Sequence, residues 1–423
     1  MPARCLRPAC FAAGLVATFG VFGPAAAWGQ APPGAGVPPR FTLVDGDRVV
    51  LLGSTFIERD QSYGYLEAAL SSRFHRSDIQ FRNLGWSGDN VFGEARAGFQ
   101  RVEHGFEELK KHVAALSPTV ILLNYGANES FAGKAGLERF LAGLETLLAA
   151  LDETGARIVF IAPPPHEDLG RPLPDPAEHN RSLQIYAAAI ANVAARRGAP
   201  CVNLFELLGG KLQPPAETHL TDNGIHLTAN GYWRAAPVIE QALGLPERRW
   251  QVEIDAARGN VAASGTLVRQ ARFSPGEIRF FALDRQLPLP PPPADSPPEC
   301  REVNPRVVRA FDLPAGTYAL KIDGRQVAAG TARQWADGVT VADGPELAQA
   351  ERLRETILEK NELYFHRWRP QNVTYLLGFR KHEQGQNAAE IPQFDPLVAA
   401  RETAIRGLCT PIEHEYQLVR VEE

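Results

Sequence analysis

The residues best suited to chemistry begin with Ser54 and Thr55, which follow Gly53 and the apolar run at residues 49–52. A short apolar run that ends in Gly-Ser-Thr and continues in helix-compatible residues predicts a buried parallel strand that turns sharply into a helix. Ligands bind at the carboxyl ends of such strands, where the first N–H groups of the following helix stabilise negative charge. Either hydroxyl is therefore a candidate nucleophile, although serine and threonine are also ordinary helix N-caps.

Other residues supply the groups that such a nucleophile needs. A hydroxyl requires an adjacent base at neutral pH, and His226 lies at a comparable strand-to-helix junction, in the stretch LTDNGIHLTANGYW. Asp222 or Asn223 is available to orient its imidazole. The backbone N–H of the hydroxyl turn, the N–H of Gly85 and the side-chain amide of Asn128 would donate to an oxyanion, and each such donor is worth about 3 kcal/mol of barrier.

Each of these residues also has a purely structural interpretation. Gly85 and Gly126 suit turns that require positive φ, Asn128 suits a helix N-cap, and His226 suits a partly buried position with its hydrogen bonds satisfied. The six residues between His219 and His226 fit no helical pair of metal ligands. Neither a metal nor another cofactor is predicted.

The elements that must position these residues alternate between strand and helix from residue 41 to about residue 245. Strands are expected at residues 49–52, 79–84, 119–125, 157–162 and 201–204. Helices are expected at residues 56–74, 98–116, 137–154, 180–197 and 228–243. This alternation predicts βαβ units and a parallel sheet covered on both faces, which is a three-layer α/β/α sandwich.

Here the chain resembles the SGNH hydrolases, also called GDSL-type esterases and lipases, in a secreted bacterial form with a C-terminal extension. The matching blocks, in order and spacing over residues 41–245, are Gly53-Ser54-Thr55, Gly85, Gly126 with Asn128, and Asp222 with His226. The resemblance implies a flavodoxin-like fold and an exported ester hydrolase without a cofactor. Its implied substrate is an O-acylated carbohydrate or a small carboxylic ester.

Two positions depart from the family pattern. The family's aspartate and serine positions after Gly53 hold Ser54 and Thr55, and threonine is a hindered nucleophile because its branched Cβ crowds attack. Three residues before His226, the usual aspartate position holds Asn223. Attack by Ser54, attack by Thr55 and the absence of any covalent nucleophile therefore stay open. The last alternative is a catalytically degenerate SGNH fold that acts as a glycan-binding module.

The amino-terminal residues predict export. Arg4 and Arg7 precede an apolar run at residues 11–22 and small residues, which is the pattern of a signal peptide at residues 1–31. Residues 32–40 are a Pro/Gly-rich flexible leader. Because no later apolar run reaches about 18 residues, no membrane span is predicted and the expected location is secreted or periplasmic.

Charge and cysteine content limit the partners. Removal of residues 1–31, which carry two arginines and no acidic residue, changes the formal charge from −5 to −7. Such a mildly acidic chain gives no reason to expect nucleic acid as a partner, and the composition does not indicate an oligomeric state.

Of the cysteines that remain after residue 31, Cys300 and Cys409 are the expected disulfide, with three unpaired thiols as the alternative.

Two further segments follow the α/β domain at residues 41–246. Short β-rich runs separated by turn residues predict a small β-rich domain at residues 247–343, and helical periodicity returns in the C-terminal extension at residues 344–423. Within the extension, Arg367 and Arg369 lie among aromatic residues, a combination that suits binding of charged sugar rings. Alternatively, the segment docks on the α/β domain with its charges in structural ion pairs, near the active site.

Overall fold

A five-stranded parallel sheet positions the predicted site residues. The computed structural model describes residues 41–210, 218–296, 303, 305–383 and 387–421, so the predicted signal peptide and leader lie outside the described residues. The sheet has the order β2-β1-β3-β4-β5. Its strands are β1 (Arg48–Gly53), β2 (Gln80–Asn83), β3 (Val120–Asn124), β4 (Arg157–Ala162) and β5 (Cys201–Asn203). The predicted strands are confirmed within a few residues at their ends.

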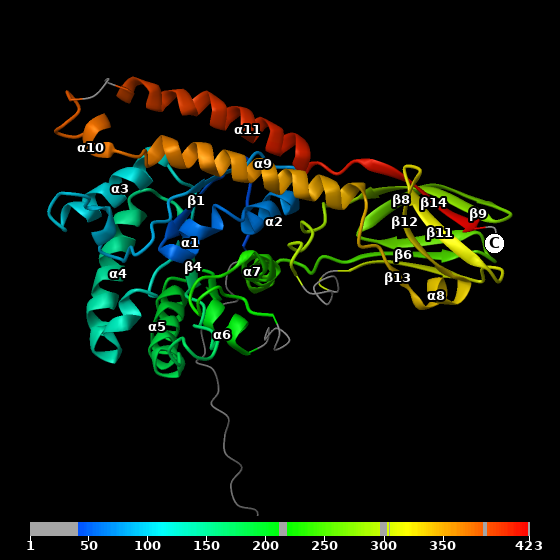
Figure 1. Ribbon diagram of the computed structural model, residues 1–423, viewed down its shortest axis with the longest axis horizontal. Helices are drawn as coiled ribbons and strands as arrows, with labels where there is room; N and C mark the ends of the chain where they lie inside the picture. Colours follow the sequence, from blue (N-terminus) through cyan, green and yellow to red (C-terminus); the bar gives the residue numbers. More distant parts are fainter. Residues whose placement is uncertain (1–40, 211–217, 297–302, 304, 384–386, 422–423) are drawn as a thin grey trace, which may run out of the picture. The chain divides into compact units, whose positions relative to one another are not determined.

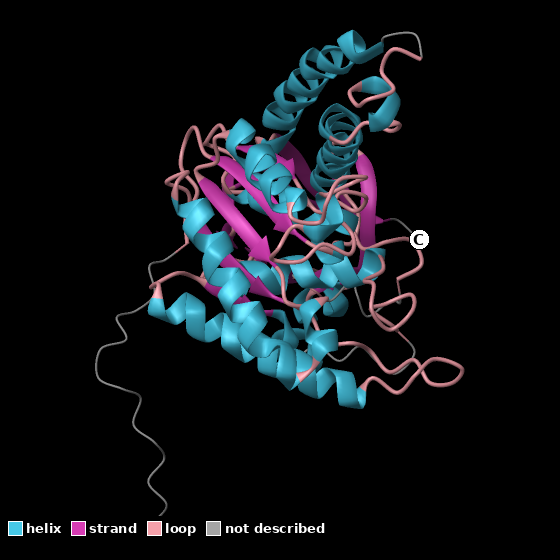
Figure 2. Cartoon of the chain, turned by 90° about the vertical axis from the view of Figure 1, so that its left-hand side faces the viewer, coloured by secondary structure: helices cyan, strands magenta, loops and turns pink. Residues whose placement is uncertain are grey.

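Helices cover both faces of this sheet, as Figure 2 shows. They are α1 (Thr55–Asp60), α2 (Tyr65–Arg73), α3 (His104–Leu116), α4 (Leu137–Asp152), α5 (Ala177–Arg196), α6 (Leu204–Gly210) and α7 (Ala229–Ala242). Alternate residues of β1 enter different apolar cores: Leu51 packs in the core that contains α2 and α7, and Leu52 in the core that contains α3, α4 and α5. The strands are therefore apolar on both faces, and the predicted α/β/α sandwich is confirmed.

One predicted helix is divided in two. Residues 56–74 carry helical spacing throughout, but α1 ends at Asp60 and α2 starts at Tyr65. Gly64 lies between them with φ +68, a left-handed conformation that favours glycine, and a Cβ there would lie 3.1 Å from the side chain of Leu358. The close approach of a distant helix thus accompanies the break, and periodicity alone does not reveal it.

Strands from the middle of the chain, together with β14 near its C-terminal end, form two further sheets that enclose an apolar core of their own. One sheet has the order β13-β10-β6-β7 and the other β12-β11-β14-β9-β8. Their strands are β6 (Trp250–Asp255), β7 (Asn260–Ser264), β8 (Thr266–Ser274), β9 (Glu277–Asp284), β10 (Arg306–Phe311), β11 (Thr317–Ile322), β12 (Arg325–Thr331), β13 (Val339–Thr340) and β14 (Glu413–Val421). A short helix, α8 (Ala332–Asp337), is added to them. The predicted β-rich region is present.

The C-terminal extension contributes to both parts of the chain. Its helices are α9 (Pro345–Trp368), α10 (Val373–Leu376) and α11 (Phe394–Cys409), and α9 and α11 lie side by side (Figure 1). Its last strand, β14, pairs with β9 and β11 of the β-rich region. No strand was expected there. Among the described residues, no helix combines the length and apolar character needed to cross a membrane.

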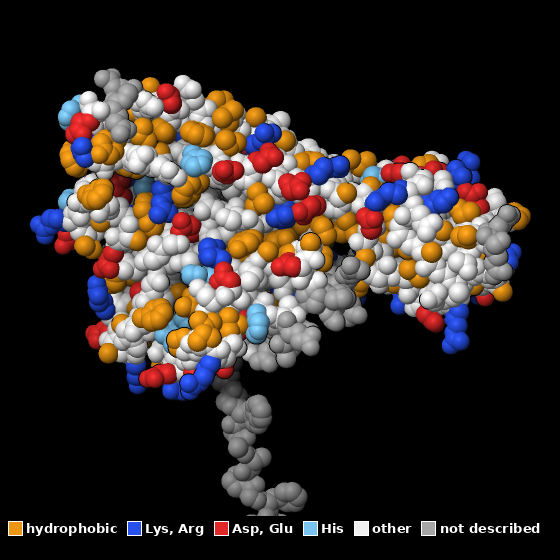
Figure 3. All heavy atoms as spheres, in the orientation of Figure 1, with side chains coloured by type: hydrophobic (Ala, Val, Ile, Leu, Met, Phe, Trp, Pro, Cys, Tyr) orange, Lys and Arg blue, Asp and Glu red, His pale blue; other side chains and the backbone are white. Residues whose placement is uncertain are grey.

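The described residues show a surface of mixed charge and two free cysteines. Basic and acidic side chains are intermixed over the face seen in Figure 3. Cys201 and Cys409 are both thiols, and burial raises the pKa of Cys409 to about 12. Cys300 lies outside the described residues, so its pairing with Cys409 stays a prediction.

A buried ion pair docks α9 on the α/β domain. Lys360 Nζ donates to Glu67 Oε1 on α2 at 2.6 Å and to the carbonyl oxygen of Phe81 at 3.1 Å. The side chains of Lys360 and Glu67 are 1% and 4% exposed. Burial lowers the pKa of Lys360 and raises that of Glu67, and it also raises the pKa of nearby Asp60 to about 7. Loss of one partner would leave the other charge buried without compensation.

Lys360→Met is therefore expected to lower the free energy of unfolding by about 3–5 kcal/mol, measured by urea denaturation. The double variant Lys360→Met/Glu67→Met removes both charges and is expected to recover most of that loss, because apolar replacement of a whole buried pair is often neutral. A double variant that is less stable than the single one would contradict this account of the docking contact.

Candidate functional site

The loops that follow β1, β2 and β3 meet at one edge of the parallel sheet. In the register of the sheet, Leu51 of β1 lies beside Asn83 of β2, and Gly53 lies beside Asn124 of β3. The backbone N–H of Ser54 donates to the carbonyl oxygen of Asn124 at 3.2 Å. Three of the predicted blocks are therefore brought together at the carboxyl ends of adjacent strands.

Ser54 is the N-cap of α1 and is buried, with 3% of its surface exposed. The side-chain amide of Asn128 donates to Ser54 Oγ at 2.8 Å and to the backbone carbonyl of Asp89 at 2.5 Å. The hydroxyl of Ser54 thus already occupies the amide donor predicted for the oxyanion. Its burial also restricts the approach of a substrate.

Thr55 is the first residue of α1 and is partly exposed. Its Oγ1 accepts the backbone N–H of Gly88 at 3.3 Å. Gly88 has φ +78, and a Cβ added there would meet no atom within 4 Å, so the loop is open beside it. Thr55 therefore combines a reachable hydroxyl with a backbone donor.

Gly85 and Gly88 have different environments. The N–H of Gly85, predicted as an oxyanion donor, is directed to the side-chain oxygen of Asn83 at 2.8 Å. A Cβ at residue 85 would lie 2.2 Å from the backbone nitrogen of Glu58, so this glycine allows β2 and α1 to approach closely. Gly88 is not among the predicted donors. The second glycine of Gly85-Trp86-Ser87-Gly88 is the feature of the sequence that could have indicated it.

A buried ion pair supports the backbone under this loop. Asp89 Oδ2 accepts from Arg96 Nε at 2.7 Å and from the Tyr125 hydroxyl at 2.9 Å, and the Asp89 and Arg96 side chains are fully buried. Burial raises the pKa of Tyr125 well above its usual value, so its hydroxyl stays a donor. Glu129, whose pKa burial also raises, accepts the N–H groups of Val91 and Gly126. These contacts fix the loops that carry Gly88 and Asn128.

Asp222, Asn223 and His226 reach the same edge from the segment before α7. Asp222 forms an ion pair with Arg59 of α1 at 2.8 Å, and the Tyr232 hydroxyl donates to the carbonyl oxygen of Phe56 at 2.7 Å. The structure therefore brings this segment beside the hydroxyl turn. Within the described residues, no hydrogen bond joins His226 to Ser54 or Thr55.

Asn223 contacts His226 through its NH2 group. Its side-chain oxygen accepts the backbone N–H groups of Ile225 at 3.1 Å and His226 at 2.9 Å, which orients the amide. Its nitrogen then lies 3.1 Å from Nδ1 of His226. Because an NH2 group donates, Nδ1 accepts, and a neutral ring carries its proton on Nε2. Desolvation, with Arg59 nearby, lowers the pKa of His226, and Asp222 opposes the shift.

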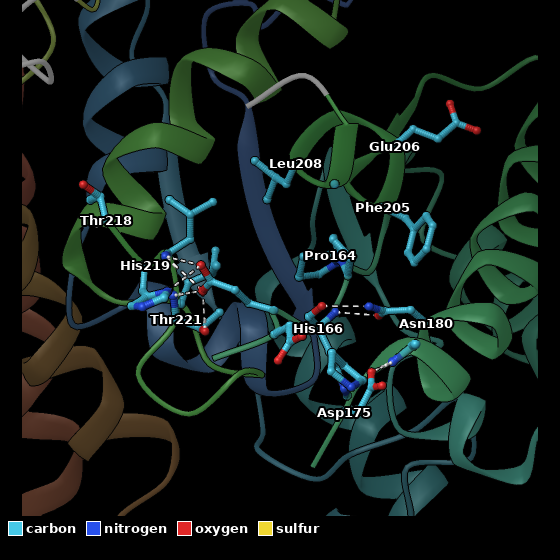
Figure 4. A pocket seen from close by; sticks show the side chains of 18 residues that line it. Pro164, His166, Asp175, Asn180, Phe205, Glu206, Leu208, Thr218, His219 and Thr221 are labelled. Carbon is cyan, nitrogen blue, oxygen red and sulfur yellow. Dashed lines mark hydrogen bonds and ion pairs between the residues drawn. The ribbon is translucent and has the colours of Figure 1, made fainter. Parts of the chain in front are cut away.

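A cavity of about 810 Å³ lies next to this segment. His219 and Thr221 line it from the segment before α7, and His166 and Asn180 from the loop after β4 and from α5 (Figure 4). Asn180 exchanges two hydrogen bonds of 2.8 Å with the backbone of His166. Burial lowers the pKa of His166 to about 4. Within the described part of the chain, no group of three or more His, Cys, Asp or Glu is placed to hold a metal.

The two arginines predicted to bind substrate both lie in ion pairs. Arg367 Nε donates to Asp395 at 2.8 Å, and Arg369 Nη1 donates to Glu58 of α1 at 2.9 Å. The Arg369 guanidinium also lies over the ring of Trp86, 3.6 Å from its centroid. Arg369 therefore reaches the loop that carries Gly88.

Comparison with known proteins adds a family and a fold. Residues 47–234 match the GDSL-like lipase/acylhydrolase family. No curated protein matches the chain in sequence. BT4096, described as a gut microbial diltiazem-metabolizing enzyme, is 16% identical with a TM-score of 0.70, over 90% of this chain and 99% of its own. Axe2, an acetylxylan esterase from Geobacillus stearothermophilus, is 18% identical with a TM-score of 0.38, over 49% of this chain and 98% of its own.

Proposed function

Residues 47–234 form a domain of the GDSL-like lipase/acylhydrolase family, and on that premise we propose that the chain is an exported ester hydrolase whose attacking group is the Thr55 hydroxyl. The choice of Thr55 over Ser54 rests on one observation. Thr55 is partly exposed and its Oγ1 accepts the Gly88 N–H, whereas Ser54 is buried against the amide of Asn128. The N–H groups of Gly88 and Thr55 are the proposed oxyanion hole, and the Asn128 amide joins it as a third donor only when its bond to Ser54 Oγ breaks.

The proposed reaction has two steps. Thr55 Oγ1 bonds to the ester carbonyl carbon, its proton passes to Nε2 of His226, and the bond to the alcohol breaks as the alcohol takes up that proton. Water then attacks the acyl-enzyme by the same route and releases the acid. The proton transfer needs His226 with its proton on Nδ1. Since Asn223 favours the other tautomer, we expect slow turnover.

The proposed substrate is an O-acylated carbohydrate or a small carboxylic ester. The cavity beside the His226 segment has a volume typical of small-molecule sites, about 300–1,000 Å³, and it is lined by polar groups such as Glu167 and His219 as well as by prolines. These groups suit hydroxyl-bearing ligands.

A specific observation also favours the second candidate function, a catalytically degenerate fold that binds glycans. The amide of Asn223 takes the place where the mechanism needs an acceptor for the Nδ1 proton of His226. With a base held in the wrong tautomer, the same site would bind an ester or a glycan without turnover.

Hydrolysis of p-nitrophenyl acetate and of acetylated glycans by the purified protein tests the proposal, together with labelling by a fluorophosphonate probe. Slow turnover that His226→Ala removes, with the label on Thr55, is the expected result. Binding on a glycan array without turnover or labelling would favour the binding module instead.

A further inference from the structure

Glu58 on α1 connects the C-terminal extension to the loop that carries Gly88. One carboxylate oxygen of Glu58 accepts the backbone N–H of Ser87, and the other accepts Nη1 of Arg369 at 2.9 Å. Arg369 directly follows α9, more than 300 residues after Glu58 in the sequence. A residue outside the matched family domain is thus one side chain away from the proposed oxyanion loop.

The second contact is made through Trp86. The guanidinium of Arg369 lies 3.6 Å from the centroid of the indole ring, and Trp368 meets the same ring edge-on at 5.8 Å. A planar guanidinium stacks on an aromatic face in a way that an ammonium group does not. Arg369 therefore contacts both Trp86, which precedes Ser87, and the Glu58 carboxylate, which accepts the backbone N–H of Ser87.

These contacts are partly buried, whereas the loop itself is open to solvent. The side chains of Arg369 and Glu58 are 25% and 17% exposed, so their ion pair is partly shielded from solvent. Ser87 and Gly88 are exposed. The position of the Gly88 N–H therefore depends on how firmly its neighbours Trp86 and Ser87 are held.

We propose that Arg369 is a positioning residue for the oxyanion hole, which it keeps formed by holding Glu58 and Trp86 so that the Gly88 N–H faces Thr55 Oγ1. The inference rests on the proposed function for its catalytic consequence. It assigns Arg369 to the machinery of the enzyme instead of to direct contact with substrate. It also makes the C-terminal extension part of the active site.

Arg369→Ala is expected to lower kcat about 10- to 100-fold, because a misplaced oxyanion donor loses part of the 10²–10³-fold that such a donor contributes. KM is expected to change less than about twofold, since the donor acts mainly on the transition state. Arg369→Lys keeps the charge beside Glu58 but loses the flat stacking, so it should recover part of the lost kcat.

Arg406→Ala is the matched control. Arg406 forms an ion pair with Asp78, which also joins the extension to the α/β domain, but at the amino end of β2, whereas Gly85 and Gly88 follow its carboxyl end. A role in docking alone predicts that each alanine variant loses activity only in proportion to its loss of stability, because the Arg406–Asp78 pair is more exposed than the Arg369–Glu58 pair. A positioning role predicts that only Arg369→Ala loses kcat.

Hydrogen exchange followed by mass spectrometry separates this inference from the proposed function. Faster exchange of the peptide that spans residues 84–91 in Arg369→Ala, but not in Arg406→Ala, is expected even if the wild-type protein hydrolyses no ester. If the wild-type protein hydrolyses no ester, the proposed function is wrong, and hydrogen exchange alone then tests the positioning role of Arg369. Wild-type exchange in that peptide, or a wild-type kcat, in Arg369→Ala would overturn the inference.

Discussion

Thr55→Ala is expected to abolish fluorophosphonate labelling and to lower kcat/KM for p-nitrophenyl acetate by about 10³-fold or more, because it removes the proposed attacking oxygen. Ser54→Ala is expected to stay within about tenfold of wild type, since it deletes one hydrogen bond to Asn128 and leaves that amide free for the oxyanion. Because the two hydroxyls are adjacent in the chain but differ in exposure, these two variants distinguish which of them is the nucleophile.

Thr55→Ser is the conservative partner of this pair. It keeps the oxygen and the Gly88 contact but removes the methyl group that restricts rotation and crowds attack, so its kcat is expected to equal or exceed that of wild type. Circular dichroism and thermal melts of all three variants confirm that they fold. Labelling of Ser54 would identify Ser54 as the nucleophile. The same conclusion would follow if Ser54→Ala were inactive and Thr55→Ala were active.

The fold and the general location of the site could be predicted because they depend on local patterns. Apolar runs that end in glycine and polar residues marked the carboxyl ends of β1 and β3, and parallel pairing then required Ser54 and Asn128 to lie near each other. The convergence of the His226 segment on this edge followed from the same topology. In these cases, each residue's position is set by its own strand or helix.

Contacts between distant parts of the chain could not be predicted. Whether the N–H of Gly85 or of Gly88 faces the hydroxyls depends on how Asn83 and Glu58 cap the loop, which no spacing reveals. The ion pairs of Arg367 and Arg369 depend on partners 28 and 311 residues away. Likewise, β14 is a strand because an edge-to-edge partner is available on both sides, in β9 and β11.

Asn223 lies beside His226, as the sequence predicts. The direction of its amide group determines which tautomer of His226 is favoured. Two backbone N–H groups fix its oxygen, so the NH2 group is directed to His226. In a serine-protease triad, the aspartate-to-asparagine change leaves geometry intact and lowers kcat by about 10⁴ through the wrong tautomer. In the proposed mechanism, Asn223 and His226 are the equivalent pair in this chain.

Asn223→Asp is therefore expected to raise kcat/KM by about 10³- to 10⁴-fold. One carboxylate oxygen would keep the N–H groups of Ile225 and His226, while the other would accept the proton of Nδ1 and leave Nε2 free to act as the base. Asp222→Asn is the matched control, because Asp222 is paired with Arg59 and, within the described residues, forms no side-chain hydrogen bond to the His226 ring.

The pH profile gives a second test of the same change. Desolvation and Arg59 lower the pKa of His226 in the wild-type protein, so its ring is neutral, as a base must be, down to a pH below the usual range for histidine. A carboxylate at residue 223 would raise that pKa, and the acid limb of kcat/KM should move to higher pH. The gain in activity would be complete above the raised pKa and lost as pH falls through it. A folded Asn223→Asp protein that is no faster than wild type at any pH would show that the tautomer of His226 does not limit this site.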